Sequence, residues 1–248
     1  SKDTEKFDQK LLNILNSSAS AKAWSDLLPT NKKILTNLNK YKKDIDFAKI
    51  SNKHMLSKRL AQCLNPEFPH GVHEVVLEIY KILINNIMGR HEMKLLDNLS
   101  LFACGLFTFF ANANIQNKKK FLDIIKENLL NLNIYELIQC FPGLLASLIP
   151  GLDENNESTE KDIFQTFNDF ISKIGNTIFF GVYWTLLLRN QHLRASGMKF
   201  LIEKVIKYSD YIKLSEKEKS EIIDLYYPNI NTVVVNALCE VIKEEDIP

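Results

Sequence analysis

The sequence has 248 residues, of which 46% are hydrophobic and 25% are charged, so it can bury a sizeable core and is not typical of a disordered chain. It has only 8 glycines and 7 prolines, and its apolar residues recur at helical spacing, which together predict an all-α fold. The net charge of +1 provides no overall field that would attract nucleic acid. The charge is uneven, because residues 1–66 carry 13 basic and 6 acidic side chains while residues 151–248 carry 11 and 16.

Neither the cysteines nor the longest apolar runs predict a secreted or membrane-spanning protein. No secretory signal opens the sequence. Three uncharged runs, at residues 98–117, 137–152 and 174–188, are too short or too often interrupted by polar residues for a membrane span of about 20 apolar residues, so we expect buried helices there. Four cysteines occur singly in apolar patterns, which is typical of buried reduced thiols in a cytosolic protein: Cys63, Cys104, Cys140 and Cys239.

In chain order, the first apolar stripe predicts a helix that closes at Ser17. A short apolar patch around Trp24 should end at Pro29, and a separate helix should follow. Ser51 is then predicted to be the N-cap of a helix that ends near Leu64. The helix after Pro29 carries the most basic surface of the chain, which consists of Lys32, Lys33, Lys40, Lys42 and Lys43.

The next feature is a rigid corner between two helices. The first helix should end just before Pro66, because a proline ring disfavours the α region for the residue that precedes it. Pro69 and Gly71 punctuate the connection, and an apolar stripe predicts a long helix over residues 72–88. We expect this corner to be a structural joint, with the binding surface elsewhere in the chain.

Apolar stripes continue through the middle of the chain. One covers residues 93–113, where Gly105 is expected to let a neighbouring helix approach closely. Another opens at Asn117. A third covers residues 134–149, which Pro142 should kink or split because proline lacks the backbone donor.

The last third of the chain contains further helical patterns. Thr159 and Asp162 resemble a capping box. The most aromatic stretch, residues 179–184, is interpreted as core, and further stripes occupy residues 194–206 and 234–241. About ten or eleven helices result, which favours an irregular armadillo- or HEAT-like α-solenoid, with a compact helical bundle as the alternative.

The sequence contains no recognisable catalytic or metal-binding motif. It lacks a P-loop, GxSxG, GxGxxG and HExxH. His70, His73 and Cys63 are ligand-like residue types, but they offer too few well-placed donors for zinc. Glu74 and Glu78 share a helix face, which we interpret as an exposed acidic face rather than an acid/base pair. We therefore predict no enzyme activity, no cofactor and no metal.

The lysines offer an alternative function. Those at positions 32–43, together with Lys118 to Lys120, could contact anionic lipid headgroups, each contributing about 1 kcal/mol near a charged surface. A solvated helical face is the competing interpretation.

The stretch around the corner resembles the signature of the N-terminal domain of the Dopey family. The resemblance lies in Arg59-Leu60-Ala61-Gln62-Cys63-Leu64-Asn65-Pro66 and in the positions that follow it. These signature residues, which we expect to build the joint, are Arg59, Gln62, Asn65, Pro66, Pro69, Gly71, His73 and Glu78.

Other segments resemble the same family in the same order. Trp24-Ser25-Asp26-Leu27-Leu28 is similar to an early KWSDLL-like segment, and Gly105-Leu106-Phe107 to a GLFP-like segment in which Thr108 replaces proline. Residues 148–154 are similar to an LLPGLEE-like segment. The remaining matched positions are Phe179, Phe180, Trp184, Arg194, Phe200 and Leu201.

The resemblance implies that residues 1–248 are a single N-terminal helical domain of a much larger cytosolic scaffold. Such scaffolds are peripheral on Golgi and endosomal membranes and act in traffic between them. The partners it implies are proteins: a large Arf exchange-factor-like scaffold, and possible links to kinesin light chain and an aminophospholipid flippase. It assigns no catalytic residue to this domain.

Overall fold

The computed structural model describes residues 2–21, 23–87, 101–103, 105–153, 156–204 and 213–220. These residues form helices and connecting turns, and no β-strand occurs among them, so the predicted all-α fold class is confirmed. The chain divides into two compact units, Ser1–Cys140 and Phe141–Pro248. Several sequence predictions lie wholly or partly outside the described residues: the helix at 234–241, parts of those at 72–88, 93–113 and 194–206, and the surroundings of Cys104 and Cys239.

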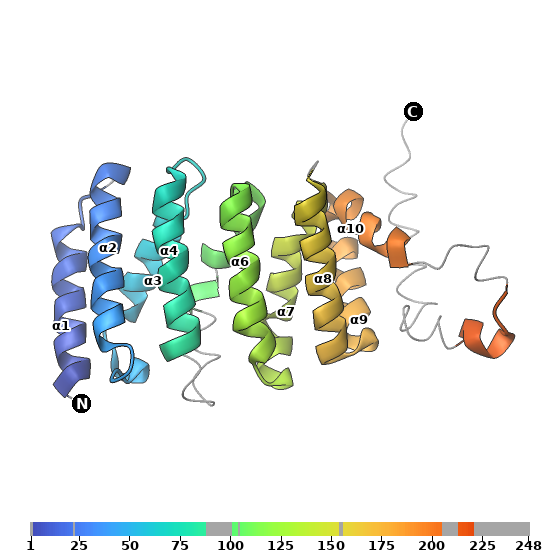
Figure 1. Ribbon diagram of the computed structural model, residues 1–248, viewed down its shortest axis with the longest axis horizontal. Coiled ribbons are helices and arrows are strands. Elements are labelled where there is room, and N and C mark those ends of the chain that lie inside the picture. The colour runs from blue at the N-terminus through green and yellow to red at the C-terminus, as the bar shows by residue number, and fades with distance from the viewer. Residues whose placement is uncertain are drawn as a thin grey trace. The chain divides into compact units, whose positions relative to one another are not determined.

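In the first unit, helices pack in chain order. Helix α1 contacts α2, α2 contacts α4, and α4 contacts α6, so these four lie side by side in Figure 1, with α3 behind them against α1 and α4. The α-helices are α1 (Lys2–Ser17), α2 (Trp24–Tyr41), α3 (Lys53–Cys63), α4 (His70–Ile82) and α6 (Ile115–Glu127). The shorter elements are the 3-10 helices η1 (Phe47–Lys49), η4 (Phe110–Asn112) and η5 (Leu129–Asn131), and the π-helix η2 (Leu83–Ile87).

In the second unit, α8 packs against α9 and α9 against α10. The 3-10 helix η6 contacts both α8 and α10. The boundary between the units falls inside α7 (Ile134–Leu148), and the elements that follow it are η6 (Ile149–Asp153), α8 (Glu157–Ile174), α9 (Asn176–Arg189) and α10 (Gln191–Lys204).

Helix α2 is continuous, so the prediction that Pro29 ends a short segment was wrong. Pro29 lies only one turn and a half into the helix, where its missing N–H removes a single backbone hydrogen bond. The helix also buries Leu27 and Ile34 on either side of the proline, and each buried side chain of this size contributes about 1.5 to 3 kcal/mol. Burial of the shared face therefore outweighs the proline.

The start of α3 is held by a residue from another helix. The N-cap of α3 is Asn52 and not the predicted Ser51, and the Asn52 side chain makes no capping hydrogen bond. Instead, the Asp8 carboxylate of α1 accepts hydrogen bonds from the backbone N–H of Ser51 at 3.1 Å and of Asn52 at 3.2 Å. The side-chain amide of Asn52 also donates to Asp8 at 2.8 Å. The Ser51 prediction was wrong because the helix begins one residue later, and the Asp8 carboxylate instead holds the two residues that precede it.

We expect Asp8→Ala to lower the free energy of unfolding by about 1 kcal/mol, because it removes the hydrogen bonds that link α1 to the start of α3. Ser51→Ala is the matched control and should leave stability unchanged, since only its backbone N–H is used. Urea denaturation of both variants checks the expectation. Equal destabilisation by both substitutions would show that Ser51 caps α3 after all.

The start of α8 also differs from its prediction. Its N-cap is Asn156, whose side chain accepts from the backbone N–H of Ser158 at 3.0 Å and of Thr159 at 3.2 Å. Thr159 lies inside the helix and is buried, so it is not the first residue of a capping box. The side-chain oxygen of Asn156, three residues before Thr159, already accepts from free N–H groups at this end of the helix.

One helical stretch in the described part of the chain, Ile134–Asp153, is long and apolar enough to cross a membrane by length and composition alone. Half of its most apolar window is buried inside the structure. Leu137, Phe141 and Leu144 are completely buried, which favours a core helix. Pro142 lies within α7 and does not split it.

Candidate functional site

The joint between α3 and α4 is organised by Asn65. Its side-chain oxygen accepts from the backbone N–H of Glu67 at 3.0 Å, and its carbonyl accepts from the N–H of Phe68 at 3.0 Å. The same carbonyl lies 2.8 Å from Nε2 of His73. Pro69 then caps α4 in an extended conformation. These contacts close the turn and fix where α4 begins.

Gly71 lies beside the joint and makes none of these contacts. It lies in the first turn of α4, and a Cβ there would meet nothing within 4 Å. Its φ is not in the left-handed region, since Gly175 is the positive-φ glycine recorded among the described residues. The expectation that Gly71 helps to set the corner therefore finds no steric support.

His73 is a neutral side chain held in place by its environment. A carbonyl oxygen only accepts, so the contact with Asn65 places the proton on Nε2. Nδ1 is buried and has no hydrogen-bond partner, and the ring meets Phe109 edge-on at 5.0 Å. Burial lowers the pKa of His73, the Asn65 hydrogen bond partly opposes this effect, and His70 lowers the pKa further.

Stability of the first unit should therefore depend on pH through His73. Because the pKa of His73 is lower in the folded state, its ring stays neutral in the folded protein while the same ring gains a proton in the unfolded chain below about pH 6.5. We expect the melting temperature to be steady above that pH and to fall as the pH drops towards 5. The slope should be smaller in His73→Gln and should change much less in His70→Gln, which removes only the smallest of the three effects on the pKa of His73. Identical slopes in wild type and His73→Gln would contradict this assignment.

Arg59 ties α3 to the chain that follows α1. Its guanidinium donates to the carbonyl oxygen of Ser18 at 2.6 Å and to that of Ala21 at 3.3 Å. No ion pair between Arg59 and a carboxylate forms within the described residues. Its charge is thus held in position without being neutralised.

Gly105 lets the segment around it approach α3 closely, as the sequence predicted. A Cβ at this position would lie 2.6 Å from Cβ and 2.8 Å from Cα of Ala61, and 3.0 Å from the hydroxyl of Tyr80. Real Cβ atoms do not approach other atoms so closely. The backbone at Gly105 therefore lies directly against α3.

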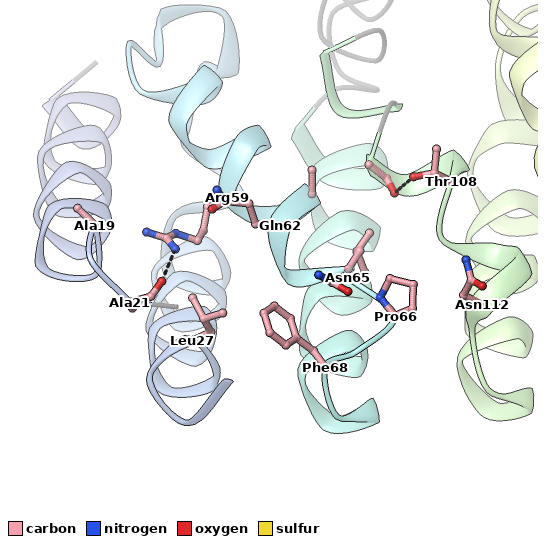
Figure 2. A pocket seen from close by; sticks show the side chains of 13 residues that line it. Ala19, Ala21, Leu27, Arg59, Gln62, Asn65, Pro66, Phe68, Thr108 and Asn112 are labelled. Atoms are coloured by element: carbon pink, nitrogen blue, oxygen red, sulfur yellow. Dashed lines mark hydrogen bonds between the residues drawn. The ribbon is translucent and has the colours of Figure 1, made fainter. Parts of the chain in front are cut away.

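These features surround a pocket of about 700 Å³ in the first unit, shown in Figure 2. The volume lies within the range of about 300–1,000 Å³ that is typical of ligand sites. The lining combines one guanidinium with amides, a hydroxyl and apolar side chains. Its residues are Ala19, Ala21, Leu27, Arg59, Ala61, Gln62, Leu64, Asn65, Pro66, Phe68, Gly105, Thr108 and Asn112.

The pocket brings together segments that sequence analysis treated separately. Leu27 belongs to the first segment that resembles the family, Arg59 to Pro66 belong to the second, and Gly105 and Thr108 come from the third. Of the corner residues, Arg59, Gln62, Asn65 and Pro66 line it, whereas Pro69, Gly71, His73 and Glu78 do not. The corner is thus both a joint and a pocket wall. Sequence reasoning missed the pocket and its Asn112 wall.

The predicted basic surface is confined to α2 and the residues just after it. Lys32, Lys33 and Lys40 are exposed, and at about 100° per residue they fall within one third of the helix circumference. Lys40 lies 5.1 Å above the ring of Tyr41. Lys42 points elsewhere, since it is partly buried and donates to the neighbouring Asn39 at 3.1 Å. Lys43 is exposed.

Of the three lysines Lys118 to Lys120 near the start of α6, two do not extend this surface. Lys118 is buried, with its ammonium 5.6 Å from the ring centre of Phe110. Lys120 pairs with Glu74 at 2.6 Å and with Glu78 at 3.5 Å, which links α6 to α4. Glu74 and Glu78 are therefore partners of a lysine and not a free acidic face.

The described residues offer no cluster of three or more His, Cys, Asp or Glu side chains that could hold a metal ion. Burial is the main cause that raises the pKa of the Cys63 thiol, against the opposing effects of Asn31 and Arg59. Burial likewise raises the pKa of Cys140 to about 12. Both thiols stay protonated near neutral pH, so neither is a ready nucleophile.

In the second unit, the matched residues have structural roles. The guanidinium of Arg194 donates to the carbonyl oxygens of Leu187 and Leu188, both at 2.9 Å, and so caps the end of α9. Asp153 accepts from the Ser196 hydroxyl at 2.5 Å and pairs with Lys199 at 3.1 Å, which fixes η6 to α10. The Ser196 hydrogen bond is the main cause that lowers the pKa of Asp153.

The fold and the pocket define an all-helical protein whose candidate site is suited to binding. A family model, "Dopey, N-terminal", matches residues 1–248. The chain therefore belongs to the Dopey family and corresponds to its N-terminal domain.

Curated relatives agree with this assignment. A DOP1 homologue of Plasmodium falciparum is 29% identical over 245 residues, which cover 98% of this chain and 6% of that protein. The protein pad-1 of Caenorhabditis elegans is 29% identical over 91% of this chain and 9% of its own length. DOP1B of Mus musculus is 29% identical over 79% of this chain and 8% of its own length. The chain thus spans less than a tenth of these relatives, and no solved structure matches it.

Proposed function

We propose that the chain is a non-enzymatic helical scaffold domain that binds protein partners during membrane traffic between endosomes and the Golgi. The observation that carries this proposal is the match of the whole chain to the N-terminal domain of the Dopey family. Resemblance to that family implies a scaffold at the cytoplasmic side of Golgi and endosomal membranes. It also implies no catalytic residue in this domain.

The proposed architecture is an irregular armadillo- or HEAT-like α-solenoid, in which residues 1–248 act as one domain of a much larger protein. The order α1, α2, α4, α6, with α3 in a second layer, supports it, because stacked helical pairs produce such layers. Helical arrays of this kind present long faces to partners without disturbing their cores.

The proposed partners come from the family resemblance. A large Arf exchange-factor-like scaffold is the first candidate, and kinesin light chain and an aminophospholipid flippase are the others. Binding of each of the three candidates to this chain can be tested separately.

Co-precipitation of the three candidates with the full-length protein, with the protein lacking residues 1–248, and with this chain alone tests the function. We expect the deletion to weaken at least one interaction and the chain alone to capture that same partner. The proposal fails if all three candidates bind the remainder as well as the full-length protein and none binds the chain.

Peripheral binding to an anionic membrane is a second candidate function, favoured by the exposed lysines of α2. Sedimentation with vesicles of phosphatidylcholine and phosphatidylserine tests it. Charge reversal at Lys32, Lys33 and Lys40 should abolish sedimentation, and added salt should weaken it, because exposed charges are screened. Charge reversal at the exposed Lys58, Lys161 and Lys173 provides a control of equal charge, and equal loss in both triple variants would exclude a defined surface.

A further inference from the structure

The pocket of the first unit holds a charge that nothing in the described chain neutralises. Of the thirteen residues that line it, Arg59 alone is ionisable. Its guanidinium has five N–H donors, and the recorded hydrogen bonds engage it with two backbone carbonyls, those of Ser18 and Ala21. Those bonds fix the side chain in one place, so the remaining donors are available to an anionic group at no further cost in ordering the side chain.

The same pocket offers amide groups that lack partners. The side-chain amides of Gln62 and Asn112 are exposed and make no hydrogen bond within the described residues. Asn65 uses its side-chain oxygen on Glu67, which leaves its Nδ2 available. An amide side chain carries both a donor and an acceptor, so it can pair with the N–H and C=O of a peptide unit.

Apolar walls lie beside these polar groups. Leu27 and Leu64 are buried at the wall, Phe68 is partly exposed, and Pro66 is exposed. The pocket therefore combines a fixed cation, amides suited to a peptide backbone and a hydrophobic surface. Figure 2 shows Arg59, Phe68 and Asn112 around this one space, contributed by three different parts of the chain.

From this arrangement we infer that the pocket binds an extended acidic peptide segment of a partner protein, with a carboxylate at Arg59 and a neighbouring apolar side chain against Leu27 and Phe68. An Arg–carboxylate pair is a strong, directional contact. A phosphoinositide headgroup fits less well, because its several negative charges would meet a single cation among neutral amides. This inference rests on the proposal that the chain binds proteins, and it names the site and the chemistry of the partner.

Binding of two fluorescent peptide libraries to the 248-residue chain tests the inference. Both contain random eight-residue peptides with a central leucine, followed by glutamate in the first library and by glutamine in the second. We expect the glutamate library to bind at least about tenfold more tightly, which corresponds to one charge-assisted hydrogen bond. Equal binding of the two libraries, or binding of neither at millimolar concentration, would overturn the inference.

Two variants locate the site. Arg59→Gln should remove the preference for glutamate, and Asn112→Trp should block the pocket from an exposed position without disturbing the core. Lys58→Gln removes a neighbouring exposed charge of α3 outside the pocket and should leave binding unchanged. Melting temperatures show whether each variant is folded. If the folded Asn112→Trp variant binds the glutamate library as tightly as the wild type, the peptide site is not this pocket.

Other occupants give different outcomes. If Asn112→Trp abolishes sedimentation with vesicles containing phosphatidylinositol 4-phosphate, the occupant of the pocket is a lipid. If it abolishes dimerisation of the chain, the occupant is a second copy of the chain. Either result would overturn the inference. If the pocket variants still capture the named trafficking partners, the scaffold function stands while this site fails. If the wild-type chain captures none of them and the remainder binds all three as well as the full-length protein does, the scaffold function itself fails.

Discussion

Phe179→Ala is expected to lower the free energy of unfolding of the second unit by about 3 to 5 kcal/mol, because it removes a completely buried ring. Phe179 packs against five other aromatic rings with centroids between 5.1 and 5.8 Å away. Its neighbours are Phe141, Phe167, Phe180, Tyr183 and Phe200. Removing a ring that contacts five others leaves a cavity, and the surrounding helices can close it only in part.

Denaturation by urea, followed by tryptophan fluorescence, measures the loss. Ile202→Ala is the control in the same unit, since that side chain is 67% exposed and its truncation should change stability by less than about 0.5 kcal/mol. Losses of similar size in the two variants would show that Phe179 is not the centre of the core. An unchanged free energy of unfolding in Phe179→Ala would contradict the packing of α9.

The aromatic helix shows how far periodicity leads from sequence to fold. Residues 179–184 were interpreted as core from their spacing alone, and Phe179, Phe180 and Tyr183 are indeed buried. Spacing succeeds here because the helix repeats its contacts every three or four residues. It cannot supply the hydrogen bond from the Tyr183 hydroxyl to the carbonyl of Gly197, which depends on how α9 meets α10.

Helix ends were predicted less well, for a related reason. Ser51 and Thr159 both satisfy the local rule for a cap, yet Asp8 and Asn156 hold those ends. Asp8 lies more than 40 residues from the helix start that it holds, so its role follows from packing of α1 against α3. A local pattern proposes candidates, and tertiary contacts choose among them.

The candidate pocket was beyond sequence reasoning for the same physical cause. Arg59 was interpreted as part of a signature, while Asn112 carried no signal, and nothing in their spacing brings them together. Their meeting depends on the close contact of Gly105 with Ala61, which is a contact between distant segments. The one signal in the sequence is Gly105, which predicts a close approach but does not indicate which helix lies against it.

Gly105→Ala is the second substitution with a large expected effect, and we expect it to destabilise the first unit by about 1 to 3 kcal/mol or more. The added methyl group would overlap Cβ and Cα of Ala61. Neither atom can move without moving α3 itself, so the strain cannot be relieved by rotating a side chain. Gly197 differs, because a methyl group there would meet the flexible end of Leu187 and a rotation could relieve it.

Gly181→Ala is the control for Gly105→Ala, because Gly181 lies in α9 with nothing within 4 Å of an added Cβ. Alanine favours helix over glycine by up to about 1 kcal/mol, so this control should gain stability while Gly105→Ala loses it. Opposite signs in urea denaturation would establish that Gly105 is required by contact and not by backbone freedom. Because Gly105 and Ala61 both line the pocket, separating them should also weaken binding of the glutamate peptide library. Unchanged stability together with unchanged binding would mean that α3 and the Gly105 segment do not touch as described.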